Sequence, residues 1–272
     1  MITYKPLKTM EEMECVSEVE SKVWGMSPIP THQTATAIKN GGIVIGAYDE
    51  QNLIGFSYGF AGFNNQKASL CSHMLGILPD YRSGGIGEKL KLKQKEEALK
   101  IGYDLMTWTY DPLQTRNAYL NLSKLHGVCN TYIRDCYGKM SDELNDGLPS
   151  DRFQIDWWIA SDYVNNFSRI FYKNPQLLDT WHINNEGLPV LDGHFNTAQI
   201  LSEPAYYVPV PNNIGELKAE NLDLALDWRY KTRAMFEEAF AQGYAAIELH
   251  KTSDAAVYYY LLVQKNTLKI PQ

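Results

Sequence analysis

The feature that most constrains this chain is a strand that ends at a proline and is followed by a glycine-rich turn and a helix. The pattern predicts a buried strand over Ala68–Leu78, ended by Pro79, and an amphipathic helix over Gly85–Ile101, closed by Gly102. The first N–H groups of a helix have no partner within it, and they carry the positive end of its dipole. A turn without side chains leaves these groups open to a phosphate. Three glycines fall within four positions of this turn, namely Gly84, Gly85 and Gly87.

Two well-known phosphate motifs do not fit this turn. A P-loop has lysine directly after its last glycine, where this chain has Glu88. A dinucleotide-binding fingerprint has glycine or alanine three residues after Gly87, where this chain has Leu90. Arg82 adds a cation beside the turn. The residues of the turn alone leave two alternatives open, an anion site and an ordinary glycine-rich turn without a ligand.

The order of predicted elements up to Ile159 is strand, helix, helix, three strands of a meander, helix, strand, helix and two strands. Such a mixture predicts an α+β fold in which helices pack on a sheet. Beyond Ala160 the pattern predicts a helix over Ser161–Tyr172, a turn at Asn184–Gly187, and a long helix over Glu220–Gln242 before a final hairpin. The elements predicted up to Ile159, in the order given above, are Ile2–Leu7, Thr9–Trp24, Thr31–Asn40 (with Thr31 as its cap), Ile43–Tyr48, Leu53–Phe63, Ala68–Leu78, Gly85–Ile101, Asp104–Tyr110, Gln114–Leu125, Val128–Tyr137 and Phe153–Ile159.

The turn resembles a known acyl-coenzyme A motif. Arg82-x-x-Gly85-x-Gly87, preceded by Ile77-x-Pro79, is similar to the R-x-x-G-x-G/A motif of the GNAT superfamily of N-acetyltransferases. The element order from Met1 to Ile159 is also similar to that of the superfamily. The resemblance implies a mixed, mainly antiparallel central sheet flanked by helices. It further implies a GNAT-like acyl-CoA-binding domain over residues 1–160 and an α/β C-terminal extension over residues 161–272, as in a bacterial subgroup.

The resemblance also implies where acetyl-CoA, the acyl donor, would bind. Its pantetheine arm is expected along the main chain of Leu75, Ile77 and Leu78. Asn117, on a later helix, matches a position that commonly contacts this arm. The amides that are expected to hold the pyrophosphate are those of Arg82, Ser83, Gly84, Gly85, Ile86 and Gly87.

Direct attack of an amine on the thioester is the mechanism that the resemblance implies, and it needs a base. His73, on the strand before the turn, has a suitable intrinsic pKa. The alternative is that His73 is only a packed strand residue. Asp111, directly after a strand, is a second candidate base. The alternative for Asp111 is a turn or helix-capping aspartate before Pro112.

The general acid departs from the family pattern. Many members carry a tyrosine near the end of the later helix, and Leu122 stands at that place in this chain. Tyr119 is the nearest tyrosine, about one turn earlier. Ser123 and Tyr110 are further candidates, and solvent is another because a thiolate is a tolerable leaving group.

Two function classes follow from the resemblance. The first is an N-acetyltransferase that transfers an acetyl or other acyl group from acetyl-CoA to an amine of a small molecule or peptide. The second is a non-catalytic acyl-CoA sensor or regulatory protein, suggested by the missing tyrosine. A structural scaffold without cofactor binding is the remaining alternative.

Composition and charge indicate which classes of partner and which cellular compartment to expect. A net charge of −7 disfavours general nucleic-acid binding. The lysine-rich run from Lys89 to Lys100 is interpreted as a solvated helix face, or as a patch that attracts the anionic cofactor. Four scattered cysteines indicate a reducing, cytoplasmic setting, and no spacing suggests a metal site. No window is apolar enough to span a membrane, and the extension is a candidate homodimer contact.

Overall fold

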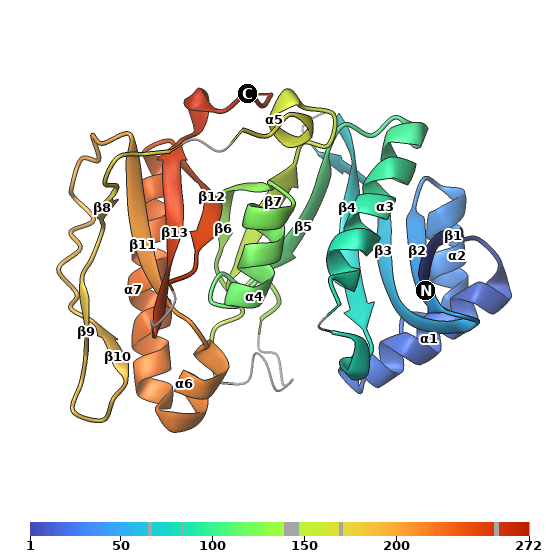
Figure 1. Ribbon diagram of the computed structural model, residues 1–272, viewed down its shortest axis with the longest axis horizontal. Helices are drawn as coiled ribbons and strands as arrows, with labels where there is room; N and C mark the ends of the chain where they lie inside the picture. Colours follow the sequence, from blue (N-terminus) through green and yellow to red (C-terminus); the bar gives the residue numbers. More distant parts are fainter. Residues whose placement is uncertain (65–66, 83, 139–146, 169–170, 253–255, 272) are drawn as a thin grey trace. The chain divides into compact units, whose positions relative to one another are not determined.

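The computed structural model describes residues 1–271 apart from 65–66, 83, 139–146, 169–170 and 253–255. The chain forms two compact units, of which the first comprises Met1–Trp108 and Trp157–Ser161 (Figure 1). The second comprises Thr109–Asp156 and Asp162–Gln272. The predicted domain boundary at residue 160 rests on the family resemblance and stays a prediction. The two compact units have other boundaries, which fall within the strands Met106–Tyr110 and Arg152–Trp157 and after Ser161.

The first unit follows the predicted order of elements. Its strands lie in the order β1-β2-β3-β4-β5, with antiparallel pairing from β1 to β4 and parallel pairing between β4 and β5. The predicted α+β fold with mainly antiparallel strands and flanking helices is therefore confirmed. The elements are β1 (Ile2–Leu7), α1 (Met10–Trp24), α2 (Thr31–Lys39), β2 (Ile43–Asp49), β3 (Asn52–Asn64), β4 (Lys67–Ile77), a 3₁₀ turn (Pro79–Tyr81), α3 (Ile86–Ile101) and β5 (Met106–Tyr110).

Helix α1 is fixed at both ends by local chemistry. Thr9 and Glu12 form a reciprocal capping box, and Gly25 ends the helix with a φ of 66°. The apolar side of α1 packs on β3, where Phe56 and Tyr58 belong to the same buried cluster. For α2 the predicted cap is wrong by one residue. Pro30 precedes the helix and its carbonyl accepts from Gln33 N (2.8 Å), so Thr31 is the first helical residue.

Helix α3 packs against β1, β2, β3 and β4. Its buried stripe contains Leu90, Gln94 and Ala98, at helical spacing. Lys91 is also buried, with 2% of its surface exposed, whereas Leu92 on the same helix is 41% exposed. The interpretation of the lysine-rich run as a solvated face is thus wrong for Lys91.

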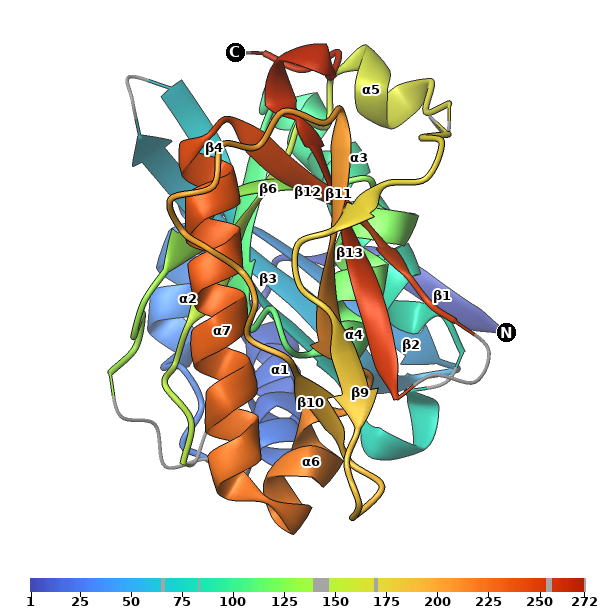
Figure 2. The same cartoon turned by 90° about the vertical axis from the view of Figure 1, so that its left-hand side faces the viewer.

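The second unit contains the remaining elements. Its strands lie in the order β7-β6-β12-β13-β11-β8, and β9 and β10 form a separate hairpin. Helix α7 lies along these strands and packs against β6, β11 and β12 (Figure 2). The elements are α4 (Thr115–Ala118), a π-helical turn (Tyr119–Lys124), β6 (Val128–Ile133), β7 (Arg152–Trp157), α5 (Asp162–Asn165), β8 (Gln176–Leu177), β9 (Trp181–Ile183), β10 (Pro189–Leu191), β11 (Ala205–Pro211), α6 (Ile214–Glu220), α7 (Leu222–Ala241), β12 (Tyr244–His250), β13 (Val257–Gln264) and a 3₁₀ turn (Lys265–Thr267).

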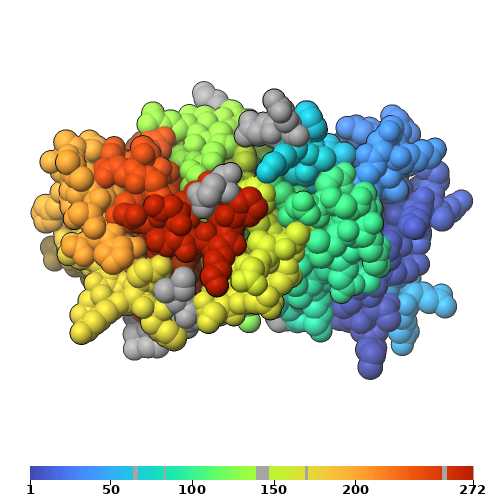
Figure 3. Space-filling model, turned by 90° about the horizontal axis from the view of Figure 1, so that it is seen from above, coloured from blue at the N-terminus to red at the C-terminus, as the bar shows by residue number. Residues whose placement is uncertain are grey.

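The C-terminal segment extends the strands of this unit. β12 pairs with β6 at Ala246↔Cys129, and β13 and β11 follow beyond it. Seen from above, the last residues of the chain (red) border the segment around α5 (yellow) (Figure 3). Lys269 lies 3.9 Å from Asp162 across this border.

Several elements differ from their predicted bounds, three of them markedly. The predicted helix Glu220–Gln242 consists of α6 and α7, because the Asn221 side chain accepts from Leu224 N (2.9 Å) and starts a new helix. Over the described residues of the predicted helix Ser161–Tyr172 only α5 is helical, and Asn166, directly after it, donates from its side chain to Asp162 Oδ1 (2.6 Å). β6 ends at Ile133, since Asp135 adopts a φ of 44° in a turn.

Aromatic side chains fill the core of the second unit. The ring of Phe153 contacts those of Phe236 and Tyr260, at centroid distances of 4.7 and 5.5 Å. All three residues are completely buried. None of the described helices is long and apolar enough to cross a membrane.

Candidate functional site

The turn between β4 and α3 has the conformation that its glycines predicted. Gly85 is the N-cap of α3 with a φ of 70°, a left-handed conformation that disfavours other residues. A Cβ atom added there would meet nothing within 4 Å, so the space next to Gly85 is open. The backbone conformation favours glycine here, and the open space would allow a ligand to approach closely.

The start of α3 offers main-chain donors. Its first internal bond runs from Lys89 N to Gly85 O (3.2 Å), and no side chain of the described residues caps this end. The N–H groups of Ile86, Gly87 and Glu88 therefore have no partner within the helix. The amide of Arg82 is engaged, because it donates to Pro79 O (3.2 Å) in the 3₁₀ turn. Ser83, which was expected to contribute an amide, lies outside the described residues.

β4 and β5 are out of register over the last residues of β4, which lead to this turn. Their parallel register comprises only Leu70↔Met106 and Cys71↔Thr107 over the described residues. Leu78 N donates to Ile54 O of β3 (2.9 Å), so the Leu78 amide is engaged. Because antiparallel strands direct the main-chain groups of alternate residues to opposite sides, those of Leu75 and Ile77 turn away from β3.

The Arg82 side chain contacts the end of β4. Its Nε donates to Ile77 O (3.1 Å), on the side of β4 that faces away from β3. The predicted groups for the pantetheine arm and the predicted cation thus lie together at the end of one strand. Gly84, like Gly85, is exposed beside them.

A β-bulge precedes this strand end. The pairs Phe60↔Cys71 and Tyr58↔Met74 leave Ser72 and His73 opposite Gly59 alone. A Cβ atom on Gly59 would lie 3.0 Å from Cys71 O and 3.2 Å from the Gln94 side chain. Glycine therefore lets β4 bulge, and such bulges re-aim side chains near functional sites.

His73 is aimed by this bulge toward two aromatic rings. Its ring centroid lies 5.7 Å from that of Phe60 and 6.4 Å from that of Tyr58. His73 is exposed, yet partial desolvation by its surroundings lowers the pKa of its imidazole. The imidazole is therefore neutral near pH 7 and able to accept a proton, and its role as base stays a prediction.

Asp111 lies in the second unit and is held on both oxygens. Oδ2 accepts from Arg229 Nη2 (2.5 Å), and Oδ1 accepts from Leu113 N (2.8 Å). The Arg229 side chain is completely buried. This geometry favours the turn-capping alternative for Asp111, because removing its charge would leave a buried guanidinium unpaired.

Asn117 and Tyr119 lie where the predicted helix Gln114–Leu125 changes type. α4 comprises a single turn, and a π-helical turn with the bond from Leu125 N to Leu120 O (3.0 Å) follows it. Asn117 is exposed on α4. The ring of Tyr119 lies under the Lys251 ammonium, at 3.9 Å. Such π-helical turns are rare and are often found at functional sites.

The other candidate acids are engaged. The Ser123 hydroxyl donates to Leu249 O (3.2 Å) and accepts from Leu249 N (3.0 Å). Tyr110 is buried beside the hydroxyl of Tyr260 at 3.3 Å, and burial raises the pKa of Tyr110 well above its usual value. Leu122, at the place of the family's tyrosine, is completely buried.

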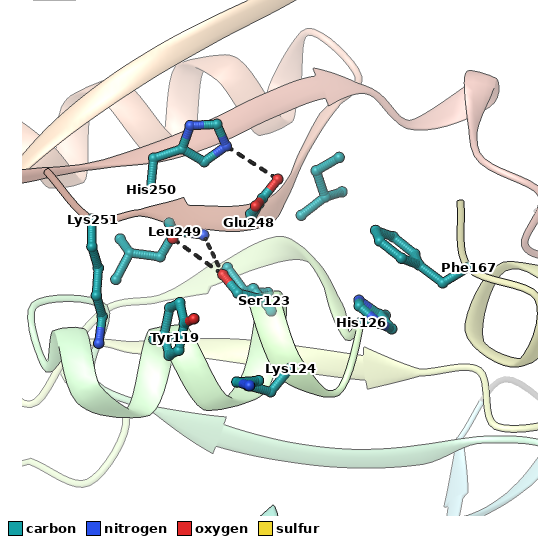
Figure 4. Close-up of a pocket in the computed structure, with 11 residues that line it drawn as sticks. Tyr119, Ser123, Lys124, His126, Phe167, Glu248, Leu249, His250 and Lys251 are labelled. Atoms are coloured by element: carbon teal, nitrogen blue, oxygen red, sulfur yellow. Dashed lines mark hydrogen bonds and ion pairs between the residues drawn. The ribbon is translucent and has the colours of Figure 1, made fainter. Parts of the chain in front are cut away.

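A pocket of about 400 Å³ lies in the second unit between the π-helical turn and β12 (Figure 4). His250 accepts or donates at Nδ1 with the Tyr207 hydroxyl (2.9 Å), and its Nε2 lies 3.1 Å from Glu248 Oε2. His126 stacks on Phe167 at 3.6 Å. The lining residues are Tyr119, Leu122, Ser123, Lys124, His126, Phe167, Ile247, Glu248, Leu249, His250 and Lys251.

Sequence reasoning missed this pocket, apart from Tyr119 and Ser123. The available signal was the spacing of Glu248 and His250, which share one face of a predicted strand. Among the residues that the structure describes, no group of three or more His, Cys, Asp or Glu could hold a metal ion.

No protein-family model and no curated protein matches the sequence. Solved structures similar to the chain include yncA of Salmonella typhimurium, a candidate acetyltransferase with its cofactor acetyl-CoA. It has a TM-score of 0.48 and 12% identity, and the match covers 64% of this chain and 98% of that one. The ribosomal-protein-S18-alanine N-acetyltransferase of Escherichia coli has a TM-score of 0.47 and 16% identity, with 64% and 100% covered.

An acetyltransferase of the GNAT family from Streptococcus pneumoniae is similar at a TM-score of 0.47 and 11% identity, with 57% of this chain and 98% of that one covered. Identities of 11–16% and TM-scores below 0.5 do not show a shared activity. All three structures are described as acetyltransferases, and the one from Streptococcus pneumoniae is described as a GNAT family member.

Proposed function

We propose that this protein is an acetyltransferase that uses acetyl-CoA as its donor and binds it in the first unit. The uncapped start of α3 carries the proposal, because it follows the end of β4, which is out of register with β5 beyond Cys71. The amides of Ile86 and Gly87 suit the doubly charged pyrophosphate, aided by the helix dipole. The outward main-chain groups of Leu75 and Ile77 suit the amides of the pantetheine arm, which binds as an added strand would.

The proposed reaction is direct acyl transfer to an amine of a small molecule or peptide. The acceptor nitrogen attacks the thioester carbonyl, the C–S bond breaks, and the thiolate leaves and takes up a proton. His73 first removes a proton from the acceptor ammonium, since its lowered pKa keeps it neutral at pH 7; the resulting amine attacks, and the second proton that its nitrogen loses goes to the thiolate. The enzyme contributes orientation above all, and no covalent acyl-enzyme is required.

Calorimetry with coenzyme A tests the binding site through a matched pair of glycine variants. Gly85→Val and Gly25→Val each place a β-branched residue at an exposed position with open space and a φ of 70° or 66°. Both changes strain the backbone to a similar extent. We expect Gly85→Val to abolish binding and Gly25→Val to leave the dissociation constant unchanged. Equal binding by both variants would contradict the proposed site.

A non-catalytic acyl-CoA sensor is the second candidate, and one observation favours it. Leu122 is completely buried where related enzymes have a tyrosine, and Ser123 is engaged with the main chain of β12. Free thiol release with a panel of amines separates the two functions. Turnover that is lost in His73→Gln supports the transferase, whereas tight binding without release for any amine supports the sensor.

A further inference from the structure

Lys91 brings an ammonium group into the interior of the first unit. Only 2% of its surface is exposed, although lysine is rarely buried without an acidic partner. Two of its contacts are with uncharged groups: Nζ donates to the Ser72 hydroxyl (2.7 Å) and lies 3.7 Å from the ring centroid of Trp108. Burial of this kind is costly, which points to a purpose other than solubility.

The first contact of Lys91 is with the bulge of β4. Ser72 belongs to the bulge opposite Gly59, and its hydroxyl donates to Gln94 Oε1 (2.5 Å). Gln94 Nε2 in turn donates to Ile43 O of β2 (3.3 Å). A chain of hydrogen bonds therefore fixes the bulged residue to α3 and β2, and Lys91 is its first donor.

The second contact of Lys91 is with β5. Trp108 lies one residue beyond Thr107, the last residue of β5 in register with β4. The Trp108 ring lies edge to face with Trp157 at 5.9 Å, so its orientation is fixed from the other side as well. Lys91 thus contacts both strands at the point where they part.

We propose that Lys91 is a positioning residue for the pantetheine arm, because it sets the width of the gap between β4 and β5 through Ser72 and Trp108. The inference rests on the proposed binding of acyl-CoA at this gap. A cation over an indole ring together with a charge-assisted hydrogen bond holds two elements firmly. The arm then enters a gap that is already formed, and it does not have to separate two strands.

The charge of Lys91 responds to pH in the physiological range. Burial lowers the pKa of Lys91 to about 7, while the nearby Cys71 thiol of β4 acts in the opposite sense. On α3, Lys95 lies one turn further along, with its ammonium 5.8 Å from the ring of Trp157. β5 contributes the uncharged ring of Trp108. Protonation of Lys91 strengthens both of its contacts, so the gap is held most firmly below pH 7.

Binding of two ligands to Lys91→Met tests this inference. The ligands are coenzyme A and adenosine 3′-phosphate 5′-diphosphate, which has the nucleotide and pyrophosphate but lacks the arm. Methionine keeps the length of the side chain and removes the charge and the donor. Lys100→Met is the matched control, because Lys100 lies on the same helix and is 65% exposed.

We expect Lys91→Met to weaken binding of coenzyme A on the order of tenfold. Binding of the truncated nucleotide is expected to stay within about twofold, and Lys100→Met is expected to change neither. In the wild type the preference for coenzyme A over the truncated nucleotide should fall as pH rises through about 7, and in Lys91→Met it should not. Should Lys91→Met fail to fold, Trp108→Phe and Ser72→Ala test the same two contacts.

An equal loss for both ligands would assign Lys91 a merely structural role and overturn the inference. So would an unchanged preference for coenzyme A in all three variants. A wild type that binds neither ligand would instead refute the proposed function, so the two failures are distinguishable.

Discussion

Arg229 and Asp111 form an ion pair inside the second unit, with 2.5 Å between Nη2 and Oδ2 and no exposure of the arginine side chain. The two residues are far apart in sequence and join α7 to the segment that follows β5. Breaking a buried ion pair on one side leaves a charge without compensation. A structural role of Asp111 can therefore be measured as a loss of stability when its charge is removed.

Asp111→Asn is expected to lower the free energy of unfolding by about 3–5 kcal/mol, because Arg229 stays buried without its counter-charge. Urea denaturation measures the change. Glu237→Gln breaks the exposed pair with Arg134 and serves as the control, with an expected loss below about 1 kcal/mol. An Asp111→Asn protein of wild-type stability but without acetyl transfer would instead identify Asp111 as the base.

Lys91 is expected to make stability depend on pH. Its pKa is about 7 in the folded chain and 10.5 in the reference state, so folding releases a proton between these values. The unfolded chain binds more protons there, and stability therefore rises with pH from about 7 toward 10.5. In Lys91→Met this part of the slope should be missing. Equal slopes for wild type and variant in chemical denaturation at pH 7 and 9 would contradict the burial of the ammonium.

His73 is expected to control the acidic limb of the rate profile. Its pKa is lowered from 6.5 by desolvation, and a base acts only when unprotonated. We therefore expect kcat/KM to stay constant as the pH is lowered to 6.5, and to fall only at a lower pH, where His73 becomes protonated. His73→Gln should lower kcat and remove this limb. A variant that keeps both the rate and the limb would leave His73 as a packed strand residue.

The break between α6 and α7 depends on one asparagine. Asn221→Ala removes the acceptor for Leu224 N and is expected to lower the free energy of unfolding by about 1 kcal/mol. Asn221→Asp, which keeps an acceptor, should restore most of this loss. Thermal or urea unfolding of the pair decides between a capping role and mere helix continuity.

Local signals predicted much of the first unit. β1 has its predicted bounds, and Gly85 caps α3 where the glycine cluster indicated. These features depend on neighbouring residues, such as Thr9 with Glu12 or the three glycines of the turn. The mainly antiparallel sheet was implied by the family resemblance, and the strands of the predicted meander agreed with it.

Contacts between distant residues could not be predicted in the same way. Lys91 lies in a hydrophilic run, and its burial depends on contacts with Ser72 and Trp108, which are distant in sequence. The partner of Asp111 is supplied by α7, and no local pattern announces it. The pocket beside His250 likewise depends on β12 reaching the π-helical turn. The donors at the start of α3 were foreseen, whereas the groups that shape the gap beside them were not.

The boundary between the two units falls within β5 and within β7, and again after Ser161. The backbone therefore passes from one unit to the other more than once. A protease that cuts a single one of these connections leaves at least one fragment that carries parts of both units. Neither unit is an uninterrupted stretch of the chain. A single truncation of the gene therefore cannot produce one complete unit without residues of the other.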